Sequence, residues 1–369
     1  MAVDAQLGLR PGTRTVARIV SVTLLVLAGA AILPAASVAA MPRISVHGNR
    51  LYAGSKPWRA WGMNWGLGDH APVVAYFDDP TAANLAVLSG ELRTARAIGA
   101  NSMRIYLQLG QVMATPTQPR QSTLTALKRL LAVAQGNGIY LDITGNLVWQ
   151  PSHAPAWYDQ LPAPARWRVQ ARFWKAVAHA ASSSPAVLCY ELTSEPIVAS
   201  APGYYYGQMG DWYFVQSIAT ASGPEADLLA RAWTRLLANA VRSQDNRPVT
   251  IGLLPATTGP FAPAKVADLL DLLTVHEYPT TGQAQAAISL IRSFADHHKP
   301  VVLGETFTLS DDAPTQNAFL TGAAPHLDGA FEFFDGRIPA NVHVHTMSDA
   351  IYQASLQQFE ALRPLFLAE

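Results

Sequence analysis

Hydrophobic and polar positions alternate along this chain with two different periods. Short apolar runs rich in β-branched residues recur eight times, as expected for buried strands. The stretches between them place apolar residues at i, i+3 and i+4, the spacing of a helix with one buried face. The expected strands are 59–65, 102–107, 139–144, 187–193, 248–254, 272–278, 300–306 and 329–334. The expected helices are 81–98, 122–135, 166–181, 225–243, 263–271, 283–297, 314–324 and 348–366.

Eight strand–helix units favour a closed parallel barrel, because parallel strands need helical crossovers. We therefore predict an α/β fold, a single (β/α)8 (TIM) barrel. A short β-hairpin is expected before it at residues 44–52, since His47-Gly-Asn-Arg50 has turn chemistry between two alternating runs. An open doubly wound sheet is the competing architecture, but the chain has neither a G-x-G-x-x-G nor a Walker sequence.

Residues 1–40 have a pattern unlike that of the rest. Three arginines precede an apolar run at 19–33, and small residues cluster at 35–40. This order is typical of a secretory signal peptide. An uncleaved N-terminal anchor is the alternative, because the apolar stretch approaches the roughly 20 residues that span a bilayer. We expect residues 41–369 to form one catalytic domain, secreted or attached to the cell envelope, with no membrane span of its own.

Composition excludes several classes of protein. With 26 basic and 26 acidic residues the net charge is zero, so the chain lacks the positive charge that draws proteins to nucleic acid. A hydrophobic share of 50% excludes intrinsic disorder. The single cysteine, Cys189, is expected to be a small buried hydrophobe. His343-Val-His345 lacks a third ligand, so no metal site is predicted. We expect a monomer without a cofactor.

Polar residues at the C-terminal ends of barrel strands build the active site of this architecture. Glu195 and Glu305 close the fourth and seventh strand runs. Two facing carboxylates are the minimum for glycoside hydrolysis, in which one protonates the leaving oxygen and the other attacks the sugar or activates water. For either glutamate alone, a favourable place at a helix N-terminus is an alternative explanation. Arg104, His276 and Tyr278 on intervening strands favour the catalytic interpretation of the pair.

Four motifs, taken in order, resemble the clan of retaining β-glycosidases that includes the cellulases and β-mannanases of glycoside hydrolase family 5. The resemblance covers about residues 44–340. The motifs are the strand-two Arg104, the acid/base strand Tyr190-Glu-Leu-Thr-Ser-Glu-Pro196, the strand-six Val275-His-Glu-Tyr278 and the nucleophile strand Val302-Leu-Gly-Glu305.

The resemblance implies a role for each of these residues. Glu195 would be the acid/base and Glu305 the nucleophile. Arg104 would bond the nucleophile and keep it ionised. Tyr278 would donate a hydrogen bond to Glu305, and His276 would contact substrate or the acid/base. Enzymes of this clan retain the anomeric configuration, which requires carboxyl groups about 5–5.5 Å apart. They need no metal or cofactor.

Two departures from the family pattern bear on the substrate. The residue before the acid/base is Ser194, where the clan has an asparagine that reaches the sugar 2-hydroxyl. Asn64 and Asn146 are candidates to replace that contact.

The second departure lies on strand eight, which often ends in a tryptophan platform under the reacting sugar. This chain has Phe333-Phe334 there. Trp65, Trp149 or the aromatic loop within 197–224, which contains Trp212, could provide the platform instead.

Two further acids lie on the expected strands. We expect Glu191 to face the barrel interior and pair with Arg104, since it precedes Glu195 by four positions. Asp142 is expected to be a structural acid.

The sequence thus predicts a secreted glycoside hydrolase that cleaves a β-linked hexose glycan, of glucan or mannan type, by a retaining double displacement. One alternative is a non-catalytic carbohydrate-binding or cell-envelope protein on a degenerate barrel, and another is a transglycosylase.

Overall fold

The computed structural model describes residues 41–65, 72–148, 153–196 and 212–367. Residues 41–369 form one compact unit. The expected signal peptide or anchor lies outside the described residues and stays a prediction. Among the described residues, no helix has both the length and the apolar character needed to cross a bilayer.

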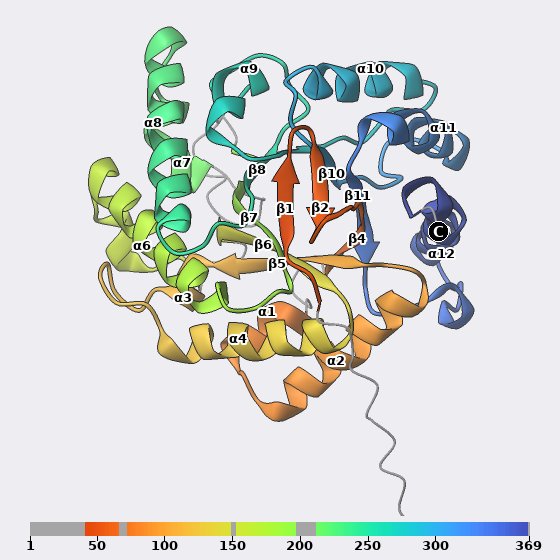
Figure 1. Cartoon of the computed structure of the whole chain (residues 1–369), viewed down its shortest axis with the longest axis horizontal. Helices are drawn as coiled ribbons and strands as arrows, with labels where there is room; N and C mark the ends of the chain where they lie inside the picture. Colours follow the sequence, from red (N-terminus) through yellow and green to blue (C-terminus); the bar gives the residue numbers. More distant parts are fainter. Residues whose placement is uncertain (1–40, 66–71, 149–152, 197–211, 368–369) are drawn as a thin grey trace, which may run out of the picture. The chain divides into compact units, whose positions relative to one another are not determined.

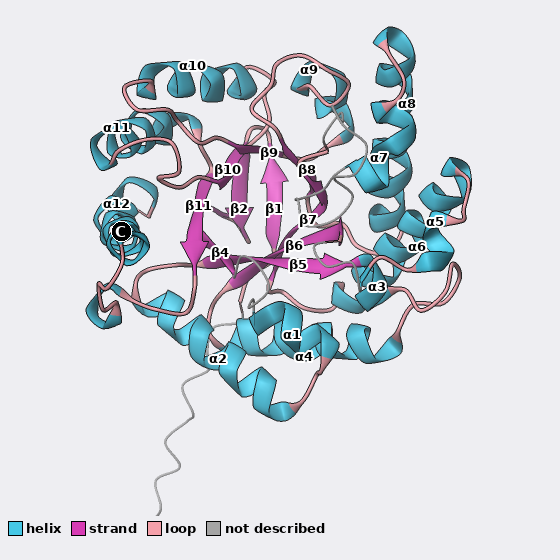
Figure 2. Cartoon of the chain, turned by 180° about the vertical axis from the view of Figure 1, so that it is seen from behind, coloured by secondary structure: helices cyan, strands magenta, loops and turns pink. Residues whose placement is uncertain are grey.

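Eight parallel strands close into a barrel, as predicted, and helices surround it (Figure 2). Each strand overlaps one of the eight predicted strand ranges, and β5, β6 and β7 extend beyond the predicted ends. In barrel order the strands are β4 (Ala60–Trp65), β5 (Ser102–Gln108), β6 (Tyr140–Leu147), β7 (Val187–Ser194), β8 (Val249–Leu253), β9 (Leu273–His276), β10 (Val301–Glu305) and β11 (Gly329–Phe334).

The helices of the outer layer match the predicted ones, with short additions. The long ones are α2 (Ala82–Ala97), α4 (Gln121–Gly136), α6 (Ala163–Ala181), α8 (Gly223–Arg242), α10 (Ala284–Ala295), α11 (Ala313–Ala323) and α12 (Met347–Phe366). Only one turn of α-helix, α9 (Pro263–Val266), forms in the weakly helical stretch 263–271. The sequence analysis missed α1 (Pro72–Asp78), α3 (Leu109–Val112), α5 (Ala156–Asp159) and α7 (Trp212–Ala219).

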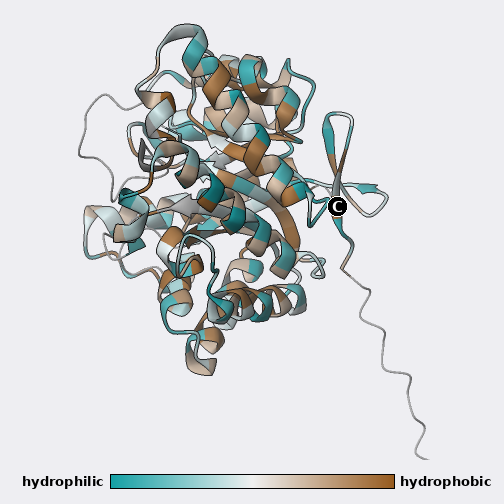
Figure 3. Cartoon of the chain, turned by 90° about the vertical axis from the view of Figure 1, so that its left-hand side faces the viewer, coloured by the Kyte–Doolittle hydropathy of each residue, from teal (hydrophilic) through white to brown (hydrophobic). Residues whose placement is uncertain are grey.

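The helices hold the barrel through their apolar faces, and Figure 3 shows hydrophobic and hydrophilic residues side by side along them. In α4, the periodic Leu124, Leu127, Leu130, Leu131 and Ala134 are all buried. Removing apolar surface from water is the main favourable contribution to folding. This burial stabilises the packing of the helices against the barrel.

A small antiparallel sheet precedes the barrel. The predicted hairpin is present as β1 (Ile44–His47) and β2 (Arg50–Ala53), and β3 (Lys56–Pro57) adds a third strand. Buried residues of β1 and β2 pack in one cluster with residues at the start of the barrel strands, among them Cys189. Figures 1 and 2 show β1 and β2 lying across the opening of the strand ring. The sheet covers the N-terminal end of the barrel strands, and Glu195 and Glu305 lie at their C-terminal end.

Candidate active site

Glu195 is held by an unusual backbone turn at the end of β7. Its φ is 46°, in the left-handed region that non-glycine residues rarely adopt, and its amide donates a 2.6 Å hydrogen bond to the carbonyl of Gly252. The pairing of β7 with β8 also shifts register between Glu191 and Ser194. Strict alternation would put neighbouring side chains on opposite faces. The shift and the turn together bring Glu191, Ser194 and Glu195 to the barrel interior.

Glu305 is the last residue of β10 and is fully buried. Its Oε2 accepts a 2.7 Å hydrogen bond from the hydroxyl of Tyr278, and its Oε1 accepts one from Nη1 of Arg104. Burial alone would raise the pKa of Glu305, but the charges of His276 and Arg104 and the bond from Tyr278 outweigh it. The net pKa lies below its ordinary value. Glu305 is thus kept ionised although its side chain is buried.

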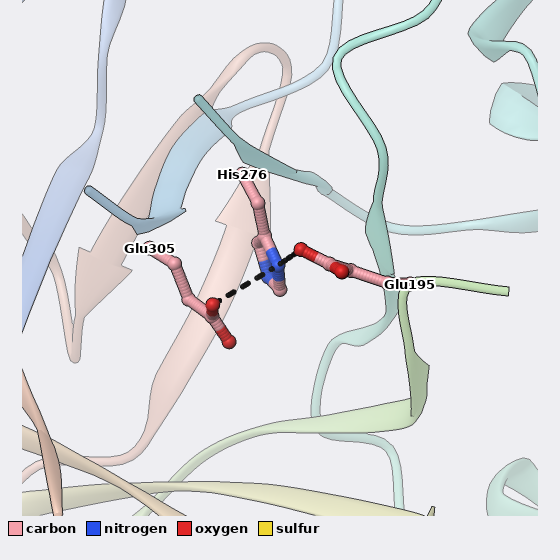
Figure 4. Close-up of side chains that lie close together, drawn as sticks. All are labelled: Glu195, His276 and Glu305. Carbon is pink, nitrogen blue, oxygen red and sulfur yellow. Dashed lines mark hydrogen bonds and ion pairs between the residues drawn. The ribbon is translucent and has the colours of Figure 1, made fainter. Parts of the chain in front are cut away.

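His276 lies between the two glutamates (Figure 4). Its Nδ1 is 2.9 Å from Oε1 of Glu195 and 3.5 Å from Oε2 of Glu305. Burial alone would lower the pKa of His276, but the Glu305 charge and the contact with Glu195 raise it above its ordinary value. One oxygen of each glutamate and a ring nitrogen of His276 all lie within 4.8 Å of one another.

These three groups are close enough to share a metal ion. A guanidinium already contacts Glu305, however, and its positive charge opposes the binding of a second cation beside it. Two carboxylates at this spacing, one of them stabilised as the anion, instead suit a proton donor and a nucleophile that act on one sugar carbon.

Arg104 forms hydrogen bonds with several side chains of the site. It is fully buried, and its Nη1 and Nη2 donate to Glu305 and Glu191 respectively. Nη2 also donates a 3.0 Å hydrogen bond to the hydroxyl of Ser194, and Nε a 3.0 Å bond to Thr144. The expected contacts of Arg104 with Glu305 and with Glu191 are both present. Ser194 faces the arginine and is fully buried.

Asn64 does not replace the missing asparagine of the family, contrary to one expectation. It is fully buried, and its Nδ2 donates to the carbonyls of Gly304 (3.0 Å) and Glu332 (3.1 Å). Its Oδ1 accepts from Arg104 (2.9 Å) and from the hydroxyl of Tyr106 (2.7 Å). Because both atoms of its amide group are hydrogen-bonded within the protein, Asn64 supports Arg104 and has no free group for a sugar.

Trp65 is also not a sugar platform. It follows Asn64 on β4, so its side chain points to the other face, into the layer between barrel and helices. It is fully buried there and donates a hydrogen bond from Nε1 to Glu91 of α2.

Three further predicted contacts cannot be placed. Trp149 lies outside the described residues, as do the side chains of Asn146, within β6, and Trp212, at the start of α7. These expectations remain predictions.

Two aromatic residues, Phe333 and Tyr106, support the site, and the sequence analysis gave neither of them a role there. Phe333 on β11 stacks on Tyr278, with ring centroids 6.5 Å apart and 13° between the planes, and meets Phe307 edge-on at 5.8 Å. It thus holds the ring that donates to Glu305. Tyr106, two residues after Arg104, bonds Asn64 and accepts a 3.1 Å bond from Nη1. Its same-face spacing on a strand was the signal that could have identified it.

An apolar hollow of about 230 Å³ lies next to Glu195. Pro196, which directly follows Glu195, forms part of its wall with residues of the loop after β8. The other lining residues are Leu254, Ala256, Thr258, Gly259, Pro260, Phe261 and Ala262. Sugar rings have apolar faces that pack against such walls, so the hollow is suited to a part of the ligand beyond the reacting carbon.

Neither a family model nor a curated protein sequence matches the chain. Solved structures do resemble it. An exo-β-1,4-mannosidase from Opitutaceae bacterium strain TAV5 aligns with 89% of this chain at 14% identity and a TM-score of 0.61, and the chain spans 61% of that protein's length.

Two other solved structures are matched over most of their own length. A GH5_18 protein from Streptomyces cattleya, in complex with GlcNAc, aligns at 17% identity with a TM-score of 0.63, over 85% of this chain and 81% of its own. The β-mannanase of the blue mussel Mytilus edulis aligns at 15% identity with a TM-score of 0.59, over 88% and 97%. At these identities the likeness shows a shared fold, a (β/α)8 barrel like that of glycoside hydrolase family 5.

Proposed function

We propose that this protein is a retaining β-glycosidase that acts on a β-linked hexose glycan of the glucan or mannan type. One observation carries the proposal: oxygens of Glu195 and Glu305 lie within 4.8 Å of each other on either side of His276. Retaining enzymes hold their carboxyl groups about 5–5.5 Å apart, whereas inverting enzymes leave about 6.5–9.5 Å for a water molecule.

The surroundings of the two glutamates support different roles for them. Glu305, kept ionised by Arg104 and Tyr278, attacks the anomeric carbon while Glu195 protonates the departing glycosidic oxygen. The C–O bond to the leaving group breaks as the bond to Glu305 forms. Water then attacks the glycosyl-enzyme, gives its proton to Glu195 and releases Glu305. His276 orients the acid/base through Nδ1.

The substrate class and the location rest on weaker support. Two of the solved structures described above are named as a β-1,4-mannosidase and a β-mannanase, and both belong to the same fold. The pattern of residues 1–40 supports export, which would bring the domain to polysaccharides outside the cell.

The test compares wild type with Glu195→Gln and Glu305→Gln on β-glucans, β-mannans and aryl β-glycosides. Both variants should lose at least about 10²-fold in kcat on polysaccharide, the scale of a lost general acid. On an aryl glycoside with a good leaving group, Glu195→Gln should still release a burst of phenol, because the first step then needs no proton. Glu305→Gln should give no burst.

Glu332→Gln is the matched control, since Glu332 is a buried strand glutamate. Its side chain points to the opposite face of β11 from its neighbour Phe333, which packs on Tyr278. It should keep wild-type turnover. Failure of the wild-type protein to turn over any of these substrates would contradict the proposal.

A further inference from the structure

One arginine, Arg104, contacts two carboxylates in this site. The guanidinium of Arg104 contacts Glu305 through Nη1 and Glu191 through Nη2, and all three side chains are fully buried. Burial alone would lower the pKa of Arg104, but the charges of Glu191, Tyr106 and Glu305 hold that pKa well above its ordinary value. Arg104 therefore contacts Glu191 as directly as it contacts Glu305.

Glu191 also lies next to the histidine of the site. A Cβ added to Gly252 would come within 2.7 Å of Oε1 of Glu191 and 2.9 Å of Nε2 of His276, so the two groups meet over this glycine. The hydroxyl of Thr144 donates a 3.3 Å bond to the same oxygen. Oε2 of Glu191 and Nε2 of His276 have no hydrogen-bond partner among the described residues.

A second acid lies beside Glu191 in this layer. Burial, followed by the Glu191 charge, raises the pKa of Asp142 to about 8, so Asp142 carries a proton at neutral pH. The titratable and charged groups around Glu191 are Arg104, Tyr106, Asp142, Cys189, His276 and Glu305, with Glu195 beyond the histidine. One guanidinium, that of Arg104, thus contacts two carboxylates, Glu191 and Glu305, in this part of the site.

We propose that Glu191 is a positioning residue of the reaction, which fixes the plane of the Arg104 guanidinium against Glu305 and offsets part of its positive charge. This inference rests on the proposed glycosidase function. An arginine that served Glu305 alone would stabilise the anion further, and an over-stabilised carboxylate is a weaker nucleophile. Sharing the charge keeps Glu305 ionised and basic enough to attack, and the negative charge of Glu191 favours the protonated form of His276.

The decisive variant is Glu191→Gln, which keeps the shape and removes the charge. A negative charge raises the pKa of neighbouring acids and of a neighbouring imidazolium, so its loss should move both limbs of the kcat/KM profile toward lower pH. The expected shift is on the order of one pH unit. kcat should fall about 10- to 100-fold as the guanidinium loses its second anchor.

Two comparisons separate charge from structure. Glu191→Asp keeps the charge, so both limbs should stay near those of wild type although kcat falls. Glu332→Gln removes another buried strand carboxyl and should leave both limbs in place. Loss of activity in Glu191→Gln with unmoved limbs would show a merely structural role and overturn the inference.

A substrate-free readout separates this inference from the proposed function. In 15N spectra, the titration of His276 should move to lower pH in Glu191→Gln, and an unchanged titration overturns the inference even where wild type is active. If wild type turns over no substrate, the proposed function fails, and this titration still decides whether Glu191 sets the charge of the site.

If Glu191→Gln does not fold, the wild-type protein provides the test. An Arg104 held by two carboxylates should show four separate Hη resonances. Averaged resonances, which indicate a freely rotating guanidinium, would overturn the inference.

Discussion

The hydroxyl of Ser194 accepts a 3.0 Å hydrogen bond from Nη2 of Arg104, deep in the barrel. In the family that this chain resembles, the equivalent asparagine contacts the 2-hydroxyl of the sugar. Here the shorter side chain is committed to the arginine and is fully buried. Ser194 thus supports Arg104, which in turn contacts Glu305.

This arrangement predicts a gain of function. Ser194→Asn should raise kcat/KM on glycosides with a free 2-hydroxyl by about 3- to 10-fold, the value of one added hydrogen bond. The same variant should bring no gain on the matching 2-deoxy glycosides. An equal change on both substrates would mean that position 194 does not face the 2-hydroxyl.

Tyr278 should tune the protonation of the nucleophile. Its hydrogen bond lowers the pKa of Glu305, so Tyr278→Phe should raise that pKa and move the acidic limb of kcat/KM to higher pH, by about one unit. The phenyl ring can keep its stacking on Phe333, so the fold should persist. An acidic limb that stays in place, with circular dichroism confirming the fold, would remove Tyr278 from this role.

The sequence predicted the scaffold because its signals are local and periodic. Eight apolar runs and the i, i+3, i+4 spacing in α4 identified strands and helices directly. Helix α7 was hidden because it has only eight residues in an aromatic stretch with no clear polar face.

The site was predicted in part, for a different reason. Glu195 and Glu305 were found because each closes a strand run, and Arg104 because it lies on an intervening strand. The resemblance to a family then implied their roles. The hydrogen bonds of the Asn64 side chain could not be predicted from the sequence, because its partner Gly304 lies 240 positions away in the chain. The burial of Trp65 could have been foreseen, because neighbours on a strand point to opposite faces and Asn64 already faces inward.

Trp65 therefore provides a test of placement. Trp65→Phe should lower the melting temperature by several degrees, since it loses a hydrogen bond to Glu91 and part of a buried side chain. The KM for polysaccharide should not change. A large rise in KM without loss of stability would indicate a sugar platform after all.

Glu332 should make stability depend on pH. Burial, aided by the Asp311 charge and only partly offset by Gln316, raises its pKa from 4.5 to about 8. Between these values the native state holds a proton that the unfolded chain releases, so stability falls as pH rises, by up to about 1.4 kcal/mol per unit. Glu332→Gln should therefore unfold at a higher temperature than wild type at pH 8 but not at pH 4.5. Parallel curves for the two proteins would contradict this.

The spacing of Glu195 and Glu305 is tested most directly by the stereochemistry of the first product. An aryl β-glycoside or short β-glycan is hydrolysed in an NMR tube, and the anomeric proton of the new reducing sugar is followed before mutarotation. A double displacement through Glu305 predicts that the β-anomer appears first and the α-anomer grows in later. Initial release of the α-anomer would mean direct attack by water and would contradict the account.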